Sequence, residues 1–142
     1  MKTFNFKSEK SNRIYQLGEP SATITDVWFV LHGYGQLGKF FIRHFREFQA
    51  PHRLILAPEG SHHFYLNGTD GRVGASWMTK ENRLTDIQDY CNYLNQLKKH
   101  ISDQLEHPVR VHVLGFSQGV ATAFRWTDSY LFNDLYSLHG WA

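Results

Sequence analysis

Three short apolar runs, each followed by a stretch with helical spacing, constrain the fold of this chain more than any other feature. The runs cover residues 27–31, 53–57 and 109–114. An apolar run of strand length is typical of a strand buried on both faces, as in parallel sheets. The helical stretches that follow cover residues 39–49, 85–105 and 118–128. This alternation predicts one α/β unit with a mostly parallel sheet.

The remaining segments are predicted from local signals. Residues 3–7 and 13–17 alternate between apolar and polar side chains, and we expect them to form a hairpin. Residues 59–82 are rich in glycine and aromatic residues without a clear period, which predicts a long loop. A capping-box pattern at Thr85 predicts the start of the long helix, and residues 135–138 are expected to begin a further strand.

Length and composition indicate one folded domain. The 142 residues contain no repeat, low-complexity tract or linker, so we expect a single domain over residues 1–142. Hydrophobic residues make up 42% of the chain, which supplies a core and argues against disorder. Fifteen Lys and Arg against thirteen Asp and Glu give a net charge of +2, too small to indicate a nucleic-acid partner.

The chain also lacks the usual signals of secretion or membrane insertion. The single cysteine, Cys91, excludes an internal disulfide and suits a reducing compartment. No apolar run has the length of a membrane span or the position of a signal peptide. We therefore expect a cytoplasmic protein without stable membrane insertion.

The most specific motif is Gly115-Phe116-Ser117-Gln118-Gly119, a G-x-S-x-G pattern between a predicted strand and a predicted helix. This setting is typical of a nucleophile elbow, a strained turn that exposes the serine hydroxyl. Small flanking residues let the strand and the helix approach, and the N–H after the serine faces the oxyanion. The alternative is a glycine-rich turn with a capping serine. The pattern in this position favours a nucleophilic Ser117.

A second glycine-rich segment, His32-Gly33-Tyr34-Gly35-Gln36-Leu37-Gly38, fits two functions. Read from its first residue, it is a His-Gly-x-Gly loop, which forms the other half of an oxyanion hole in α/β-hydrolases. Gly33, Gly35 and Gly38 also spell G-x-G-x-x-G, and Glu59 follows about 20 residues later, as in a dinucleotide-binding fingerprint. A dinucleotide domain usually starts with its fingerprint strand, whereas two predicted strands precede this motif. The dinucleotide-binding module is kept as an alternative.

Several blocks together resemble the phospholipase/carboxylesterase family of α/β-hydrolases, which includes acyl-protein thioesterases and lysophospholipases. The matching blocks are Phe29-Val30-Leu31-His32-Gly33-Tyr34-Gly35, Ala57-Pro58-Glu59-Gly60, Gly74-Ala75-Ser76-Trp77 and Val113-Leu114-Gly115-Phe116-Ser117-Gln118-Gly119. The resemblance runs from residue 27 to the end of the chain. It implies an α/β-hydrolase-type, mostly parallel sheet with flanking helices.

The resemblance also implies a chemistry. Ser117 is expected to attack an acyl carbonyl and form an acyl-enzyme, as in a serine carboxylic-ester hydrolase. The backbone N–H groups of Tyr34 and Gln118 are expected to hold the oxyanion. The implied substrates are small acyl esters, thioesters or lysolipids, and no cofactor is implied.

This sequence departs from the family where the other triad members belong. In the family the order is Ser, Asp, His, with the acid and the base on loops after later strands. Those loops, and the last strands, are expected to be absent from this sequence. Two replacement bases are weighed, His139 together with Asp128 or Asp134, and His32. An unprotected last strand also predicts aggregation or a homodimer, and a non-catalytic, truncated hydrolase-like fold is a further alternative.

Two further residues are candidates for contact with the substrate. Trp77 lies in the aromatic segment after the second buried strand, and His32 lies beside the oxyanion loop. We expect no metal site, because the histidines lack HExxH or His/Cys ligand spacing.

Overall fold

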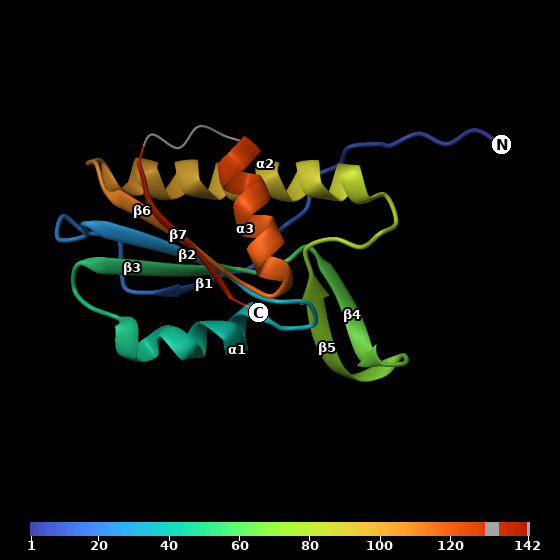
Figure 1. The fold of residues 1–142 in the computed structure, drawn as a ribbon, viewed down its shortest axis with the longest axis horizontal. Coiled ribbons are helices and arrows are strands. Elements are labelled where there is room, and N and C mark those ends of the chain that lie inside the picture. Colours follow the sequence, from blue (N-terminus) through green and yellow to red (C-terminus); the bar gives the residue numbers. More distant parts are fainter. Residues whose placement is uncertain (130–133, 142) are drawn as a thin grey trace.

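A computed structural model of the chain describes residues 1–129 and 134–141 (Figure 1). A five-stranded sheet forms the centre, with helices on both of its faces. The helices α2 (Arg83–Leu105) and α3 (Gln118–Ser129) pack on one face. The short helix α1 (Gly38–Phe41) and the 3-10 helix η1 (Ile42–Phe48) pack on the other. The predicted α/β fold with flanking helices is therefore confirmed.

The strand order brings the two glycine motifs together at the carboxyl ends of two neighbouring central strands. The order is β1 (Ile14–Leu17), β3 (Arg53–Pro58), β2 (Asp26–Leu31), β6 (Arg110–Phe116) and β7 (Leu135–Trp141). All neighbours are parallel except the pair β1 and β3. Leu31 pairs with Gly115, so the loops that follow β2 and β6 leave the sheet side by side.

Burial on both sides explains why the central strands read as continuous apolar runs. Alternate residues of β2 and β3 face the α2 and α3 side or the α1 and η1 side, and both sides are covered. Leu54 and Leu56 belong to the first core, whereas Ile55 and Ala57 belong to the second. The largest fully buried side chains are Trp77, Trp126, Phe29, Leu31, Leu54, Ile55, Leu56 and Leu94.

The predicted N-terminal hairpin is wrong. No strand forms before Ile14, and β1 pairs antiparallel with the buried strand β3 instead. Phe4 and Phe6 are 72% and 82% exposed, so the alternation of residues 3–7 marks no buried face. A pairing with a buried strand gives β1 an apolar surface to cover, which an isolated hairpin lacks.

The predicted long loop at 59–82 contains a second, two-stranded sheet. Strands β4 (His62–Asn67) and β5 (Asp70–Ser76) pair antiparallel, as Figure 1 shows beside the main sheet. Asn67-Gly68 lies at their turn, and Gly68 has a φ of 67°. An Asn-Gly pair between two strands is typical of a hairpin turn, so this pair is the sequence signal for the hairpin. Neither strand shows an apolar alternation, because β4 has no buried residue and β5 is buried only over its last three residues.

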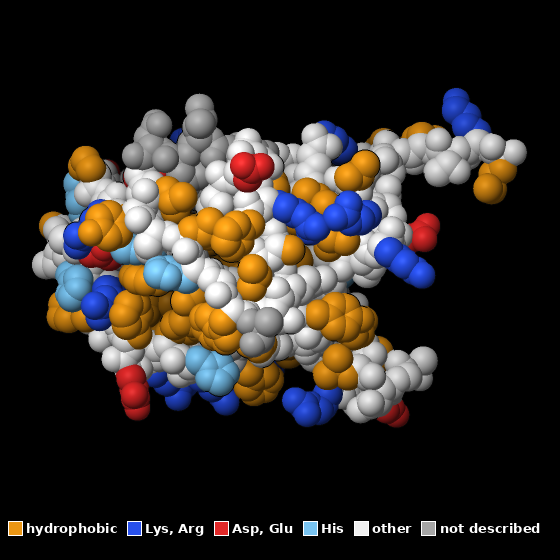
Figure 2. Space-filling model, in the orientation of Figure 1, with side chains coloured by type: hydrophobic (Ala, Val, Ile, Leu, Met, Phe, Trp, Pro, Cys, Tyr) orange, Lys and Arg blue, Asp and Glu red, His pale blue; other side chains and the backbone are white. Residues whose placement is uncertain are grey.

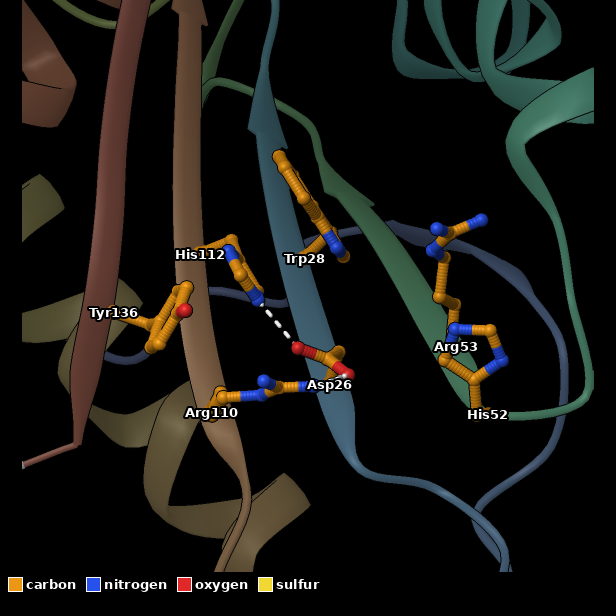
Figure 3. A pocket seen from close by; sticks show the side chains of 7 residues that line it. All are labelled: Asp26, Trp28, His52, Arg53, Arg110, His112 and Tyr136. Atoms are coloured by element: carbon orange, nitrogen blue, oxygen red, sulfur yellow. Dashed lines mark hydrogen bonds and ion pairs between the residues drawn. The ribbon is translucent and has the colours of Figure 1, made fainter.

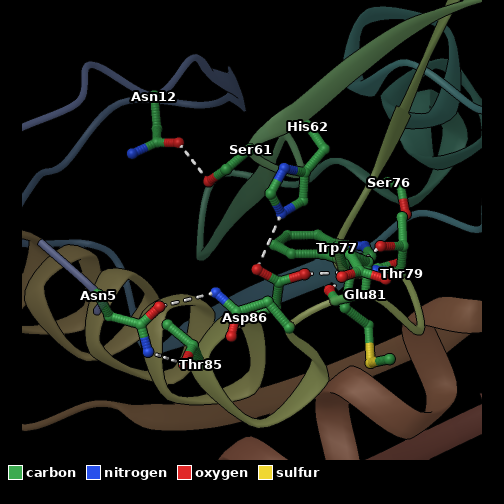
Figure 4. Close-up of polar contacts among 12 residues, drawn as sticks. Asn5, Asn12, Ser61, His62, Ser76, Trp77, Thr79, Glu81, Thr85 and Asp86 are labelled. Atoms are coloured by element: carbon green, nitrogen blue, oxygen red, sulfur yellow. Dashed lines mark hydrogen bonds and ion pairs between the residues drawn. The ribbon is translucent and has the colours of Figure 1, made fainter. Parts of the chain in front are cut away.

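The predicted capping box at the start of α2 is also wrong. The helix begins at Arg83, and Asn82 precedes it with a φ of 55° and no side-chain cap. The Thr85 hydroxyl instead accepts a hydrogen bond from the side-chain amide of Asn5 (Figure 4). Asp86, in the first helical turn, accepts one from the backbone N–H of Thr79. The N-terminal segment therefore packs along the beginning of α2.

None of the helices in the described residues is long and apolar enough to cross a membrane.

A buried carboxylate joins the start of β2 to β6. Asp26 accepts hydrogen bonds from the hydroxyl of Thr25 at 2.6 Å and from Arg110 Nη2 at 2.9 Å. His112 Nε2 lies 2.7 Å from the other carboxylate oxygen. Burial by itself raises the pKa of Asp26, but these hydrogen bonds outweigh it and lower the pKa to about 2.

The low pKa of Asp26 predicts an acid-dependent stability. Because the folded pKa lies below the unfolded value, the stabilisation is complete above about pH 4 and disappears as pH falls through about 2. Asp26→Asn should lower the free energy of unfolding at pH 6 by about 2 kcal/mol, and the loss should shrink at pH 2.5. Urea unfolding at both pH values measures this difference. Asp103→Asn, at an exposed carboxylate paired with Lys99, is the matched control. An equal effect of Asp26→Asn at both pH values would contradict the assignment.

Candidate active site

Ser117 occupies a strained turn between β6 and α3. Its φ is 55°, in the left-handed region that non-glycine residues rarely adopt. A Cβ atom on Gly115 would overlap the carbonyl oxygen of Gly119, and one on Gly119 would overlap that of Leu31. The close approach of helix and strand therefore requires both glycines. Ser117 is exposed, and its Oγ hydrogen-bonds to no residue in the described part of the chain.

The loop after β2 lies directly against Ser117. A Cβ atom on Gly33 would lie 3.1 Å from Ser117 Cβ. Gln36 holds this loop, because its Oε1 accepts a hydrogen bond from the Gly33 N–H at 2.6 Å. Strand β5 clamps the same loop, since the Gly35 N–H donates to the Ala75 carbonyl at 2.8 Å. The two predicted glycine motifs thus form one site.

The two predicted oxyanion donors belong to this junction. Gln118 is the first residue of α3, so its N–H has no acceptor within the helix. The N–H groups of Tyr34 and Gln118 donate to no group in residues 1–129 and 134–141. The N-terminus of α3 adds a partial positive charge beside Ser117. The junction is therefore chemically suited to stabilise a negative oxygen.

His32 supports the loop from inside the protein. Its side chain is 0% exposed, and its Nε2 accepts a hydrogen bond from the Gly60 N–H at 2.9 Å. In the neutral ring, Nδ1 then carries the proton and donates to the Gly33 carbonyl at 2.7 Å. Burial lowers the pKa of His32, which favours this neutral form. Both ring nitrogens are occupied, which leaves neither available to Ser117 or to a substrate.

Trp77 lies beneath the same loop. It is 1% exposed, and its indole N–H donates to the His32 carbonyl at 2.9 Å. Its backbone N–H donates to Gln118 Oε1 at 3.0 Å, and Gln118 Nε2 donates to the Met78 carbonyl at 2.9 Å. The Gln118 side chain thus ties the nucleophile helix to the segment around Trp77. This placement favours a positioning role for Trp77 and His32 over the substrate contacts expected from the sequence.

The acidic residue of the dinucleotide alternative is also occupied. Glu59 is 3% exposed, and its Oε1 accepts a hydrogen bond from the Gly38 N–H at 2.9 Å. Its other oxygen lies 2.8 Å from His63 Nε2. A Cβ atom on Gly38 would lie 2.8 Å from the ring of Tyr15, so that glycine makes room for a side chain of this protein. The geometry gives the dinucleotide interpretation no support.

An apolar groove adjoins Ser117 between α3 and the end of β7. Its volume is about 450 Å³, and its other lining residues are Val120, Ala121, Phe124, Gly140 and Trp141. Figure 2 shows apolar side chains gathered over α3 and the end of β7. This groove was not predicted from the sequence. The sequence feature that could have indicated the groove is the absence of charge at three positions on one face of the helix, Val120, Ala121 and Phe124.

The described residues bring no general base to Ser117. His139 lies on β7, where it pairs in register with Leu114 and its Nε2 lies 3.0 Å from Ser137 Oγ. Asp134 pairs with Lys98 at 3.0 Å. No histidine or carboxylate of residues 1–129 and 134–141 lies within hydrogen-bond distance of Ser117 Oγ. Neither replacement base weighed from the sequence therefore reaches Ser117.

This chain resembles several solved structures in its fold. No protein-family model matches this sequence, and no curated protein matches it. Among solved structures, a phospholipase/carboxylesterase from Dyadobacter fermentans aligns with a TM-score of 0.63 and 16% identity over 96% of this chain. The Zea mays acyl-protein thioesterase 2 aligns with a TM-score of 0.61 and 19% identity over 92%. Esterase PE8 aligns with a TM-score of 0.60 and 22% identity over 82%.

The aligned parts cover 65%, 63% and 57% of those three proteins, in the same order. At such low identity the likeness concerns the fold rather than the activity. The chain has the α/β-hydrolase fold over the part that the structure describes, with Ser117 at the junction of a central strand and the helix that follows it.

Proposed function

We propose that this chain, which has the α/β-hydrolase fold, is a serine carboxylic-ester hydrolase that acts through an acyl-enzyme on Ser117. One observation carries the proposal. Ser117 adopts a strained φ of 55° between two glycines that allow no side chain, and the residue is exposed. Strain of this kind persists only where the surrounding structure enforces it, and it is common at functional sites.

In the proposed reaction, Ser117 Oγ attacks the acyl carbonyl and the alcohol or thiol leaves. The Tyr34 and Gln118 N–H groups hold the oxyanion, and losing one such donor typically costs about 2.7–4 kcal/mol in the transition state. His32, Trp77 and the Gln118 side chain fix these donors before the substrate arrives. The Ser117 proton needs a base, and turnover depends on one that reaches Oγ from outside the described residues.

The proposed substrates are small acyl esters, thioesters or lysolipids. The groove beside Ser117 has no charged lining residue and can hold an acyl chain along α3. The proposed location is the cytoplasm, because the single cysteine suits a reducing compartment. The proposed assembly is a homodimer that covers the last strand of the sheet.

Covalent labelling tests the proposal. The purified chain is treated with a fluorophosphonate and digested with trypsin, and the peptides are analysed by mass spectrometry. Ser117 lies in peptide 111–125, whereas Ser102, an exposed serine of α2, lies in peptide 100–110. We expect an adduct on Ser117 that is absent from Ser117→Ala and unchanged in the control Ser102→Ala.

A folded chain without an adduct on Ser117 would contradict the esterase proposal. It would favour the second candidate, a non-catalytic hydrolase-like fold that binds acyl ligands. The absence of a base near Ser117 among the described residues is the observation that favours this candidate. It predicts saturable binding of a lysophospholipid with no covalent product.

A further inference from the structure

A second serine lies in a hydrogen-bonded Ser, His, Asp series on three neighbouring strands. Ser137 on β7 has its Oγ 2.6 Å from Nδ1 of His112 on β6. Nε2 of the same ring lies 2.7 Å from Oδ1 of Asp26 on β2, the contact drawn in Figure 3. His112 lies in β6 five positions before Ser117, which follows the end of that strand, so the two residues are separated by about 17 Å at the usual rise per residue. This series is therefore separate from the Ser117 site.

The proton positions in the series follow from the carboxylate. Asp26 is ionised above about pH 2 and can only accept hydrogen bonds. The His112 ring must then carry its proton on Nε2 and donate a hydrogen bond to Asp26. In the neutral ring, Nδ1 is left as a hydrogen-bond acceptor. The Ser137 hydroxyl consequently donates to His112 Nδ1. This is the bonding of an activated nucleophile, with a base that a third group orients.

Neighbouring rings fix the orientation of His112. Its ring stacks on Trp28 with centroids 4.2 Å apart and planes 4° apart. The Tyr136 ring packs edge-on against His112, with ring centroids 5.3 Å apart. A serine nucleophile depends on such an orientation, because the imidazole nitrogen must face the serine hydroxyl in order to accept its proton.

The series runs from the interior to an accessible hydroxyl. Asp26 and His112 are each 6% exposed, whereas Ser137 is half-buried and His139 beside it is exposed. His139 Nε2 lies 3.0 Å from Ser137 Oγ. When this nitrogen carries a proton, its N–H can donate a hydrogen bond to the oxygen of a group that reacts with Ser137. His112 and Asp26 also line a cavity of about 220 Å³ with Trp28, Arg110 and Tyr136, shown in Figure 3.

We propose that Ser137 is a second nucleophilic serine, activated by His112 and Asp26, that takes up acyl or phosphonyl groups from small electrophiles. Ser137 Oγ bonds to the acyl carbon or to phosphorus, and its proton passes to His112 Nδ1. The leaving group departs with the bonding electron pair: fluoride from a fluorophosphonate, or an alkoxide that takes the proton from His112. Asp26 stays ionised and stabilises the imidazolium that forms.

Site-resolved labelling tests this proposal independently of Ser117. In Ser117→Ala, a fluorophosphonate should add to Ser137, which lies in tryptic peptide 126–142 and is located there by fragmentation. The adduct should form at least tenfold faster than on Ser102 in peptide 100–110 of the same molecules. This comparison within one chain depends on no variant of the series. Ser137→Ala in the same background should remove the adduct.

A matched pair of histidine variants tests the role of the base. His112→Gln should slow labelling of Ser137 at least tenfold, whereas His52→Gln, at another histidine of the same cavity, should leave it unchanged. Circular dichroism verifies that each variant is folded. The proposal is overturned if Ser137 labels no faster than Ser102, or if folded His112→Gln labels at the rate of His52→Gln. In the parent chain, an adduct on Ser117 without one on Ser137 would support the esterase proposal and refute this one.

Discussion

Replacing Gly119 with alanine should lower the free energy of unfolding by about 3 kcal/mol or more. The added Cβ would overlap the carbonyl oxygen of Leu31, a fully buried residue of the central strand β2. No flexible side chain can move aside, so the helix itself must shift from the strand. Local preference predicts the opposite sign, because alanine is favoured over glycine in a helix by about 1 kcal/mol. Urea unfolding measures the change.

Gly68→Ala is the control for the Gly119 prediction. Gly68 has a φ of 67°, yet its added Cβ would meet no atom within 4 Å. Its cost should therefore be confined to backbone strain of about 1–2 kcal/mol. If Gly119→Ala were neutral or stabilising, the close approach that defines the turn at Ser117 would be incorrect, and the main support for the esterase proposal would fall with it.

Replacing Gly33 with valine should slow fluorophosphonate labelling of Ser117 by about a hundredfold. A Cβ at this position would lie 3.1 Å from Ser117 Cβ and 3.2 Å from the Phe116 ring, and the valine methyl groups would extend further. They would displace Ser117 or the adjacent Tyr34 N–H from the geometry that attack requires. The rate of adduct formation on peptide 111–125 measures the effect.

Gly71→Val is the matched control for the Gly33 prediction. Gly71 is the second residue of β5, at the far end of the hairpin from Ser76. Its φ of 84° makes the substitution strained locally, but a Cβ there would meet no atom within 4 Å. Labelling of Ser117 in this variant should equal that of the parent chain. An equal labelling rate in folded Gly33→Val would mean that the loop after β2 takes no part in the reaction at Ser117.

The Ser117 turn could be predicted because its chemistry is contained in five consecutive residues. The glycines at 115 and 119 are needed at fixed positions relative to the serine, so the pattern is visible without the fold. The central strands could be predicted equally well, since burial on both faces of the sheet leaves continuous apolar runs in the sequence. Strands β4 and β5 were not predicted, because β4 has no buried residue and β5 is buried only over its last three residues, so neither strand carries an apolar period.

The roles of His32 and Glu59 could not be predicted from their local sequence. Each belongs to a motif that suggests a ligand contact, yet each is buried and bonded to backbone N–H groups far along the chain. His32 accepts from Gly60, and Glu59 accepts from Gly38. Only the packed structure decides whether a polar group in a glycine-rich loop faces solvent or holds the loop.

The sequence by itself determined the α/β class, the central strands and the position of the strained serine, because each depends on neighbours along the chain. Tertiary structure alone decided which remote side chains meet. Asp26, His112 and Ser137 come together because β2, β6 and β7 are adjacent and parallel in this register. Strand order and register follow from covering both faces of the sheet at once, a requirement of the whole chain that no local pattern contains.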